Sequence, residues 1–402
     1  MKLIKYTYKF KISPTDDQIE LLNKHFGSVR FVYNYFLNQR KEEYLNNKKS
    51  LNYYDQAKYL TDIKKKEETK WLKEINSQTL QYSLNCLDIA YQGFFNKRTE
   101  FPKFKSKHNK NSFTIPQNVK VIDDFLIIPK FKGIKMIMER KIKGEIKKAT
   151  ISKTPTGKYF VSILTEKEYN PVPTTGKKVG IDLGLKDFLV LSTGSKIKNG
   201  RFLKHLEKKL KLNQKHLSKK TKGSNRYEKQ RLKVARIHEK ISNSRMDLIH
   251  KTSLNLIKNF DVIYLEDLNI KGMVKNHKLA KSISDVSWGK FIEVLTYKAL
   301  WNDKEVIHID RFFPSSKTCN SCGWINSLLT LKDRIWKCKC GLEVDRDLNA
   351  AKNILNEGLR LNNISVGTTD HGRGAKIRPE KSGKSVETSK EMNLLVLKHT
   401  NL

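Results

Sequence analysis

Three acidic residues lie where the pattern predicts the ends of buried elements. Asp182 stands in the apolar run VGIDLG, Glu266 ends the run VIYLE, and Asp347 begins a helical pattern in DRDLNAA. An acid in or beside a buried strand is costly unless it is paired or bound to a metal. If the three converge, each pair of carboxylates at about 4 Å repels by about 4 kcal/mol at an effective dielectric near 20. Such a cluster either takes up protons or binds cations.

The cation that suits this cluster is a hard divalent ion with oxygen ligands. Mg²⁺ also tolerates a site that water and phosphate complete. Two such ions would activate a water molecule and stabilise the leaving 3′-oxygen of a phosphodiester. The acids therefore indicate metal-assisted phosphodiester hydrolysis. Taken singly, each acid has a simpler interpretation, because a strand-end acid can be a solvated cap and Asp345 or Asp347 can cap its helix.

Four of the five cysteines form one short cluster, which indicates a metal rather than a disulfide framework. They are Cys319, Cys322, Cys338 and Cys340. Four thiolates suit tetrahedral Zn²⁺ in a structural site with no open position. Gly323 and Gly341 each follow the second cysteine of a pair and permit the turn that brings backbone amides to sulfur. The alternative is four reduced, buried thiols. Because the cluster precedes the Asp347 helix, we expect it to fix the position of that helix.

Composition explains how a polyanion would reach an acidic site. Among 402 residues, 80 Lys and Arg stand against 41 Asp and Glu, a formal net charge of +39. Hydrophobic residues make up 38%, enough to fold, so simple disorder is excluded. No apolar run approaches the 18 or more residues that a membrane span needs, and the charged amino terminus does not resemble a signal peptide. The chain is therefore interpreted as cytoplasmic and as binding nucleic acid.

The elements that would position the acids begin at residue 178. Strands are predicted at 179–183, 188–191, 196–200, 261–266 and 306–309, and helices at 201–259, 287–301 and 347–355. This order is typical of an α/β domain with a mixed sheet. The cysteine cluster interrupts the domain before its last helix. The remainder, 357–402, is rich in Gly, Ser, Thr and Lys, and we expect much of it to be mobile.

The amino-terminal half has a different pattern. Residues 2–12 alternate apolar and basic side chains, as a strand does. Thr15, with Gln18 three residues later, marks a helix start, and helical patterning continues to about residue 97. Short strands are then predicted at 112–115, 125–128, 149–152 and 158–164, before a Pro-rich linker at 169–177. The pattern predicts a strand platform with a helical insertion.

Three weaker candidates for nucleic-acid contact remain open. Gln78 and Gln81 could read base edges, or could belong to an ordinary polar helix face. Lys103 and Lys105 alternate with aromatic residues and could contact phosphates, or could line the wet face of a strand. The run 204–240 is very basic and is interpreted as a helix that tracks a nucleic-acid backbone, although a solvated helix would have the same composition.

These motifs together resemble the TnpB family, the transposon-encoded, RNA-guided DNA nucleases related to the type V CRISPR effectors. The matching motifs, in the family's order, are GIDLG with Asp182, YLEDLNI with Glu266, SSKTCNSCG and CKCG with the four cysteines, and DRDLNAAKNI with Asp347. The amino-terminal stretches FGSVRFVYNYFL and FPKFKSK are also similar. The resemblance covers roughly residues 1–356.

The resemblance implies an α/β nuclease in which Asp182, Glu266 and Asp347 are the catalytic residues and hold two Mg²⁺ ions. In the amino-terminal half, the implied parts are a β-barrel wedge domain at 1–12 and 101–175 and an α-helical recognition domain at 13–100. The implied nuclease part is a RuvC-like domain of RNase H-like fold at 176–311 and 342–356, with a zinc-binding insertion at 312–341 that loads target nucleic acid. A flexible basic tail is implied at 357–402. The implied partners are a guide RNA from the transposon end and double-stranded target DNA, with pairing supplying most of the specificity.

Other functions share parts of this pattern. A compact type V CRISPR effector differs only in the genomic source of its guide. A guide-directed repressor should lack at least one of the three acids, and this chain has all three. A transposase of the same fold fits the order Asp, Glu, Asp with an embedded cysteine cluster poorly. We expect a monomeric prokaryotic protein that lies on the nucleoid when it binds DNA and has no membrane partner.

Overall fold

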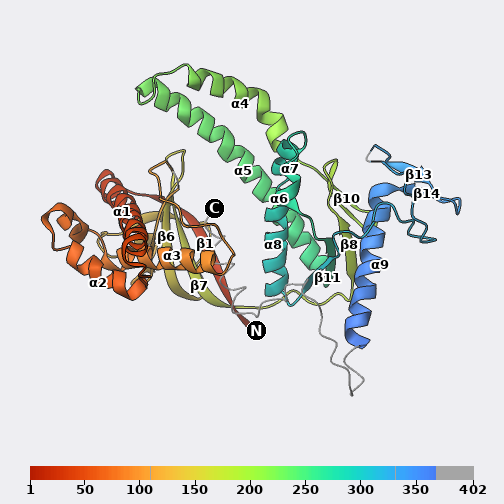
Figure 1. Cartoon of the computed structure of the whole chain (residues 1–402), viewed down its shortest axis with the longest axis horizontal. Helices are drawn as coiled ribbons and strands as arrows, with labels where there is room; N and C mark the ends of the chain where they lie inside the picture. Colours follow the sequence, from red (N-terminus) through yellow and green to blue (C-terminus); the bar gives the residue numbers. More distant parts are fainter. Residues whose placement is uncertain (109, 331, 368–402) are drawn as a thin grey trace. The chain divides into compact units, whose positions relative to one another are not determined.

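The computed structural model describes residues 1–108, 110–330 and 332–367. Two compact units are present, one from Lys2 to Tyr169 and one that begins at Asn170 (Figure 1). Within the described residues, no helix combines the length and apolar character needed to cross a membrane.

The first unit is built on an open, seven-stranded antiparallel sheet. Its strands are β1 (Lys2–Ser13), β2 (Asn111–Ile115), β3 (Lys120–Ile122), β4 (Phe125–Ile127), β5 (Ile134–Ile137), β6 (Glu145–Lys153) and β7 (Tyr159–Tyr169). The order is β2-β6-β7-β1-β5-β4-β3, so the first strand pairs with the last, from Lys2 opposite Tyr169 to Ile12 opposite Tyr159. The predicted strand platform is confirmed; β3 and β5 were not predicted, because runs of three or four residues carry too little alternation.

Helices fill the long insertion between β1 and β2. They are α1 (Asp16–Asn47), α2 (Tyr53–Ile63), the 3₁₀ helix η1 (Glu67–Glu74) and α3 (Ser77–Phe95). The predicted start of α1 is confirmed, because the Thr15 hydroxyl accepts from the Gln18 amide at 3.4 Å while the Gln18 side chain accepts from the Thr15 amide at 3.1 Å. One apolar core joins these helices to the sheet, with Leu22, Phe36 and Leu84 essentially inaccessible.

The second unit contains the predicted mixed sheet, in the order β10-β9-β8-β11-β12. Its strands are β8 (Lys178–Asp182), β9 (Asp187–Leu191), β10 (Lys196–Lys198), β11 (Val262–Glu266) and β12 (Glu305–Ile309). Strand β11 runs parallel to both β8 and β12, whereas β9 and β10 are antiparallel additions.

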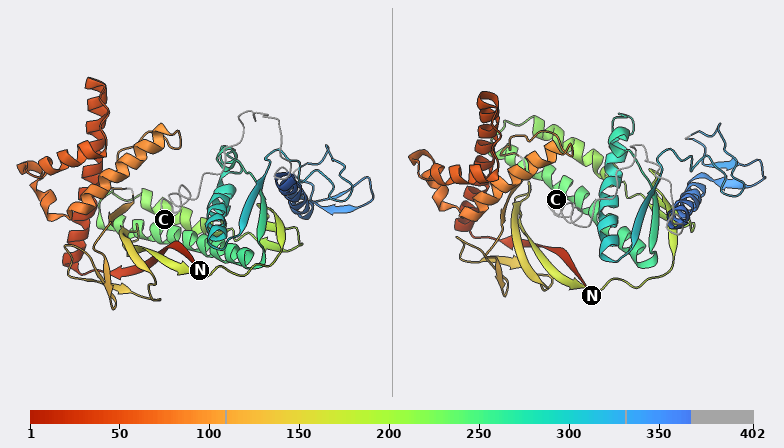
Figure 2. Two further views of the ribbon diagram at one scale, coloured as in Figure 1. Left: turned by 90° about the horizontal axis from the view of Figure 1, so that it is seen from below. Right: turned by 60° about the horizontal axis from the view of Figure 1, so that its bottom comes forward.

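The helices of the second unit are α4 (Phe202–Ser218), α5 (Asn225–Asn259), α6 (Ile270–Met273), α7 (Ala280–Val286), α8 (Trp288–Trp301) and α9 (Arg346–Gly367). Helices α5, α8 and α9 cover the faces of the sheet, whereas α4 packs against α5. Val179 and Ile181 of β8 pack with the buried side chains of α5 and α8. Between them, Gly180 faces α9, where an added Cβ would lie 2.2 Å from the Ala351 carbonyl oxygen. Figure 2 shows α8 (teal) and α9 (blue) on opposite sides of the sheet.

Two predicted helix boundaries in the second unit are wrong. The continuous helix predicted at 201–259 is a hairpin, because Gly223 adopts φ +89° and Ser224 caps a new helix by accepting from the Tyr227 amide. Helix α9 continues past 355 to Gly367, so 357–367 is not part of a flexible tail. Its continuation is supported by packing, since Gly358 lies against the Tyr264 ring. The rest of the predicted tail, 368–402, is outside the described residues.

The cysteine segment lies between β12 and α9, as predicted. It contains a small hairpin of β13 (Ile335–Lys337) and β14 (Glu343–Asp345). Its own core is a cluster separate from those of the larger sheets and is formed by Cys319, Leu329, Trp336, Cys338 and Val344. A core this small is typical of a segment that a metal stabilises.

Candidate functional site

Two of the three predicted acids stand side by side at the carboxyl ends of neighbouring parallel strands. Leu265 of β11 is opposite Ile181 of β8, so Glu266 and Asp182 follow at the same level on strands about 4.8 Å apart. Alternate residues of a strand share a face. Gly180 and Tyr264 both face α9, and Asp182 and Glu266, two positions further along, therefore face α9 as well.

The third acid comes to this face with helix α9. Ala351 lies against Gly180, and Asp347 is one helical turn closer to the start of the helix. Asp345, not Asp347, is the cap, because its Oδ1 accepts from the amides of Asp347 (3.1 Å) and Leu348 (3.0 Å). The Asp347 carboxylate is thus not used to cap its own helix, and instead accepts from Arg334 Nη1 at 3.4 Å.

The pKa of Asp182 responds to the charges of both other acids. Burial, followed by the negative charges of Glu266 and Asp347, raises the pKa of Asp182 to about 8, against a smaller opposing effect of Arg346 and Arg334. Burial also raises the pKa of Glu266. The structure therefore places Glu266 and Asp347 near enough to Asp182 for their charges to oppose its ionisation. Without a bound cation, the cluster holds a proton on Asp182 at neutral pH.

Sequence reasoning missed the side chains that hold the Glu266 region in place. The Ser315 hydroxyl donates to Glu266 Oε1 and opposes the rise in the pKa of that carboxyl. The Ser315 carbonyl accepts from Asn353 Nδ2 at 2.7 Å, and the Thr318 carbonyl accepts from Nδ2 of both Asn349 and Asn353 at 2.6 Å. Both asparagines are buried. Two asparagines four residues apart inside a helical pattern, where Asn is unfavourable, were the available signal.

The four predicted cysteines are gathered as a metal would require. Their sulfur atoms all lie within 4.8 Å of one another, with Cys322 to Cys338 at 3.5 Å and Cys319 to Cys340 at 4.0 Å. A tetrahedron with metal–sulfur bonds of about 2.3 Å has sulfur atoms about 3.8 Å apart, so the donor set fits. The cluster could hold a structural metal.

The two predicted glycine turns beside the cysteines are present. Gly323 and Gly341 adopt φ of +75° and +86°, where residues with a side chain are strained. Their amides donate to the carbonyls of Cys319 and Cys338, each at 2.9 Å. Both turns therefore present the two cysteine pairs as the sequence predicted.

The cysteine segment is fastened to helix α9. The Asn320 amide donates to Asn349 Oδ1 at 2.9 Å, in addition to the bonds that Asn349 and Asn353 make to the Thr318 carbonyl. The prediction that this segment positions the Asp347 helix is consistent with these contacts. Because Ser315 belongs to the same stretch of chain, one set of hydrogen bonds connects the cysteines, α9 and Glu266.

Two of the three weaker nucleic-acid candidates lie in the first unit, and their contacts do not test the prediction. Gln78 Nε2 donates to Gln117 at 2.9 Å, while Gln81 is exposed. Lys103 pairs with Glu100 at 2.6 Å. The Lys105 ammonium lies 3.8 Å from the centre of the Tyr33 ring. Contact of these four residues with nucleic acid stays a prediction.

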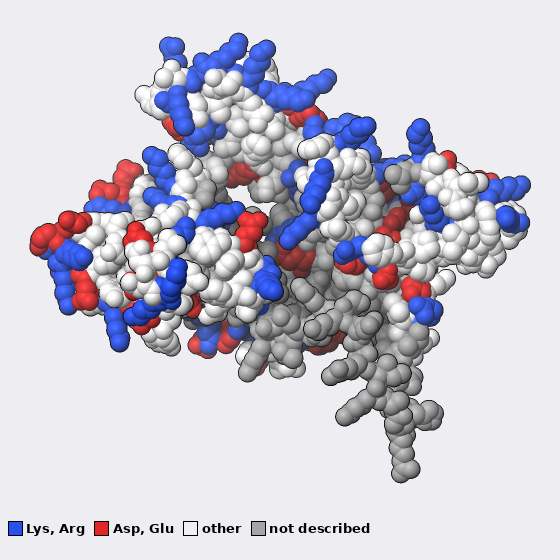
Figure 3. Space-filling model, viewed as in Figure 1, with Lys and Arg blue, Asp and Glu red and all other residues white. Residues whose placement is uncertain are grey.

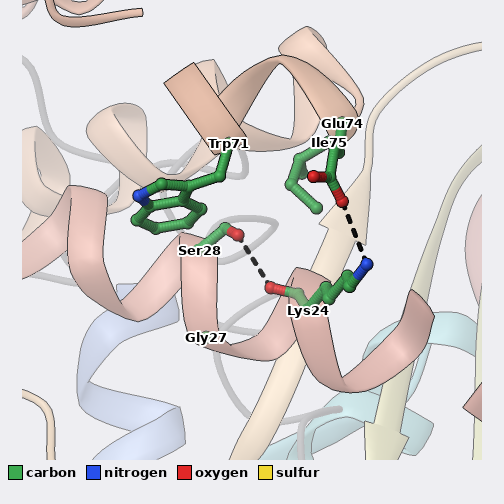
Figure 4. Close-up of a pocket in the computed structure, with 6 residues that line it drawn as sticks. All are labelled: Lys24, Gly27, Ser28, Trp71, Glu74 and Ile75. Carbon is green, nitrogen blue, oxygen red and sulfur yellow. Dashed lines mark hydrogen bonds and ion pairs between the residues drawn. The ribbon is translucent and has the colours of Figure 1, made fainter. Parts of the chain in front are cut away.

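A pocket of about 370 Å³ is also present in the first unit, and it contains none of the predicted site residues (Figure 4). It is lined by Lys24, Gly27, Ser28, Trp71, Glu74 and Ile75. Lys24 pairs with Glu74 at 3.1 Å, and the Ser28 hydroxyl donates to the Lys24 carbonyl at 2.7 Å. Its two charged groups thus pair with each other.

Three family models match the chain. The IS605 OrfB family, described as "Probable transposase", matches residues 160–277, and the Cas12f1-like TNB domain matches 288–354, which includes the four cysteines. The helix-turn-helix domain of the same IS605 OrfB group matches 1–49. In the structure these 49 residues form strand β1 and the single long helix α1, not two helices around a turn.

Relatives match over nearly the whole chain. A Streptomyces pristinaespiralis protein named "Putative RNA-guided DNA endonuclease" is 36% identical over 89% of this chain and 90% of its own length. The Escherichia coli K12 protein of the same name, InsQ, is 33% identical over 87% and 92%. The TnpB-like protein L79 of Acanthamoeba polyphaga mimivirus is 26% identical over 88% and 73%.

A solved structure shares the fold. The chain in a Cas12f1–sgRNA–target DNA complex matches with a TM-score of 0.56 at 14% identity, over 89% of this chain and 99% of that one. The extent of the sequence matches, together with the acids and cysteines in their expected order, identifies the family. This chain is a member of the TnpB family.

Proposed function

We propose that this protein is an RNA-guided DNA endonuclease that cleaves target DNA beside a short transposon-associated motif. The observation that carries the proposal is the convergence of Asp182, Glu266 and Asp347 on the α9 face of one sheet. A repressor that only binds DNA would have no use for a costly cluster of carboxylates. The names of relatives that match about nine-tenths of their own length support the same activity.

The parts of the chain follow from this proposal. The five-stranded mixed sheet, with carboxylates at its strand ends, supports a RuvC-like, RNase H-like domain at 176–311 and 342–356. Residues 312–341 would be its zinc-binding insertion for target nucleic acid. In the first unit, 1–12 and 101–175 would form the barrel-like wedge domain and 13–100 the helical recognition domain, which agrees with the sheet and its helical insertion.

The chemistry rests on oxygen donors for hard cations. Asp182, Glu266 and Asp347 would hold two Mg²⁺ ions, which when bound supply an activated water and a stabilised leaving oxygen. Ser315 keeps the Glu266 carboxylate oriented, and Arg334 lies beside Asp347. Near neutral pH, the proton on Asp182 must leave before that carboxylate can bind a cation. The four cysteines would hold one structural Zn²⁺.

The partners would be a guide RNA derived from the transposon end and double-stranded DNA, bound by a monomer. Base pairing with the guide would supply most of the sequence specificity. The excess positive charge of the chain supports a polyanionic partner.

The test is guided plasmid cleavage by protein purified with its RNA. The wild type should cut in Mg²⁺ and not in EDTA, whereas Asp182→Ala should bind RNA and target but not cut. Asp247→Ala removes an exposed acid of the same unit that pairs with Lys251, and this variant should cut at the wild-type rate. If Asp182→Ala cuts at the wild-type rate, the proposed site is wrong. Sequencing the copurified RNA separates a transposon-end guide from one transcribed from a CRISPR array.

A further inference from the structure

We propose that the helical hairpin of α4 and α5 is an arm that binds the phosphodiester backbone of a nucleic-acid strand through two rows of cations. The identity of that strand as guide RNA or target DNA rests on the proposed function. The binding of a polyanion by the arm does not depend on the proposed function. The hairpin lies between β10 and β11 in the chain, away from the carboxylates and the cysteines in sequence.

Each helix of the hairpin carries exposed cations at helical spacing. The row on α4 is Lys204, Lys208, Lys211 and Lys215, and the row on α5 is Arg226, Lys229, Lys233, Arg236 and Lys240. Steps of three and four residues place the members of a row along one side of a helix. All nine side chains are exposed, and Figure 3 shows the Lys and Arg side chains gathered on the hairpin.

Within the described residues, few acids compensate these charges. Between residues 204 and 240, fourteen Lys and Arg stand against three Glu. Among the nine row members, and within the part of the chain that the structure describes, only Lys211 forms an ion pair, at 2.8 Å to Glu207. Glu207 is shared with Lys281. Like charges three and four residues apart destabilise a helix by about 0.2–0.5 kcal/mol for each pair, so both rows oppose folding.

The rows take no part in the packing of the hairpin. Its small apolar core consists of Leu210, Ile237 and Ile241 with their half-buried neighbours. Gln230 is buried and joins the helices by donating to Asn213, at 3.0 Å to the carbonyl and 2.9 Å to Oδ1. The cations of the two rows lie outside this contact between α4 and α5. A solvated helix would need exposed polar residues, but it would not need two rows of one charge with almost no partners.

The spacing of the rows suits phosphates. Two cations for every seven residues, at 1.5 Å a residue, give one charge about every 5 Å along the helix. Phosphates of one strand of a duplex recur about every 3.4 Å along the axis, so a helix lying along a strand can meet several in succession. Lysine predominates in the rows, and it contacts phosphate as a point charge rather than reading base edges through a bidentate fork. The arm would therefore bind without regard to sequence.

The experiment compares the full-length protein with two charge variants of equal size. One changes the α5 row, Arg226, Lys229, Lys233, Arg236 and Lys240, to Gln, which is a good helix former. The control changes five exposed lysines of the first unit, Lys48, Lys49, Lys65, Lys66 and Lys73, to Gln. Affinity is measured against KCl in EDTA for two probes, the copurified RNA on RNA-free protein and a matched DNA duplex on the RNA-bound protein.

The α5-row variant should decrease the magnitude of the negative slope of log affinity against log salt. For five lost phosphate contacts, the decrease is about 3.5 on a single strand and about 4.5 on duplex DNA. A decrease with the RNA probe alone assigns the strand to the guide, and a decrease with the DNA probe alone assigns it to the target. A decrease with both probes places the arm on the paired guide and target. Slopes that change no more than those of the control overturn the proposal.

A charge-retaining variant separates loss of charge from loss of structure. Lys229→Arg, Lys233→Arg and Lys240→Arg together should keep the wild-type slopes. A slope that falls in this variant as far as in the Gln variant overturns the proposal. Because binding is measured in EDTA, the result does not depend on cleavage. The slopes would therefore still test nucleic-acid binding by the arm if the protein proved not to be an endonuclease.

Discussion

Among the three acids, Asp182 has the largest shift in pKa. Its pKa is raised to about 8 by burial and by the charges of Glu266 and Asp347, against an ordinary value of about 4. Between these two pH values the folded protein binds a proton that the unfolded chain does not. The contribution of Asp182 to the free energy of unfolding of the cation-free protein is therefore fully present below about pH 4 and is lost as the pH rises to about 8.

Removing this charge should stabilise the cation-free protein. Asp182→Asn cannot ionise, so its melting temperature in EDTA should exceed that of the wild type at pH 8, by about 2–4 °C for each kcal/mol of relieved repulsion. The difference should shrink toward pH 4, where the wild-type residue is also neutral. Calorimetry across this pH range provides the measurement. A difference that is the same at both ends would show that the repulsion is absent.

At this scale the sequence predicted residue types and missed their partners. The acids and cysteines could be recognised because a carboxylate in an apolar strand, or four cysteines in a short segment, has few other uses. Ser315, Asn349 and Asn353 could not be recognised as a unit, because their hydrogen bonds join segments more than 30 residues apart. Polar residues of this kind acquire a role only when the chain has folded.

Helix α9 is the element on which the site depends. It meets strand β8 at Gly180 and so sets the position of Asp347 relative to Asp182. The order of the five sheet strands in the second unit followed from apolar periodicity and was correct, whereas the short elements α6, α7, β13 and β14 were not predicted. The boundaries followed from local signals, and these were incomplete: the break at Gly223 lies inside a uniformly basic run, and the end of α9 depends on contacts with Tyr264.

Gly180→Ala should displace α9. The new Cβ would lie 2.2 Å from the Ala351 carbonyl oxygen, so the helix must move away from the sheet. Overpacking of this kind costs about 1–3 kcal/mol. We expect guided cleavage to fall at least tenfold while RNA binding stays near the wild-type level. Gly27→Ala is the control, because its Cβ would meet no atom within 4 Å and alanine favours a helix. Equal cleavage by both variants would contradict the role of the contact.

Loss of the metal from the cysteine cluster should loosen the segment that carries Ser315. Cys338→Ser should bind less than a tenth of the zinc that the wild type holds, as measured by elemental analysis. Hydrogen exchange should increase in residues 312–345 and at the start of α9, which are joined through Asn349 and Asn353. Cys86→Ser, outside the cluster, should change neither. An unchanged exchange pattern in metal-depleted protein would show that the cluster does not support the helix.

The whole molecule combines an acidic site with a strongly basic surface. A net charge of +39 attracts a polyanion, whereas a carboxylate cluster repels it, and in the proposed function bound cations would remove that repulsion. Composition alone predicted the polyanionic partner, and the motifs predicted the family that the relatives identify. In the first unit, the strand at residues 2–12 and the helix start at Thr15 were predicted from the sequence, whereas β3 and β5 were missed because such short runs carry too little alternation.

Charge of this size should make binding strongly dependent on salt. If about ten phosphates are neutralised, the logarithm of affinity should fall with the logarithm of salt concentration with a slope of about −9. Filter binding of duplex DNA between 50 and about 300 mM KCl measures it. A slope near zero would contradict the electrostatic account.

The convergence of three distant carboxylates into one site is tested most directly by comparing single and combined substitutions. Guided cleavage rates are measured for Asp182→Asn, Glu266→Gln, Asp347→Asn and the triple variant, with target binding as the control. Residues that act as a unit give strongly non-additive losses. Each single variant should lose at least about 10³-fold in rate, and the triple variant little more than the worst single one. Losses that multiply, or any single variant that cuts at the wild-type rate, would contradict a single shared site.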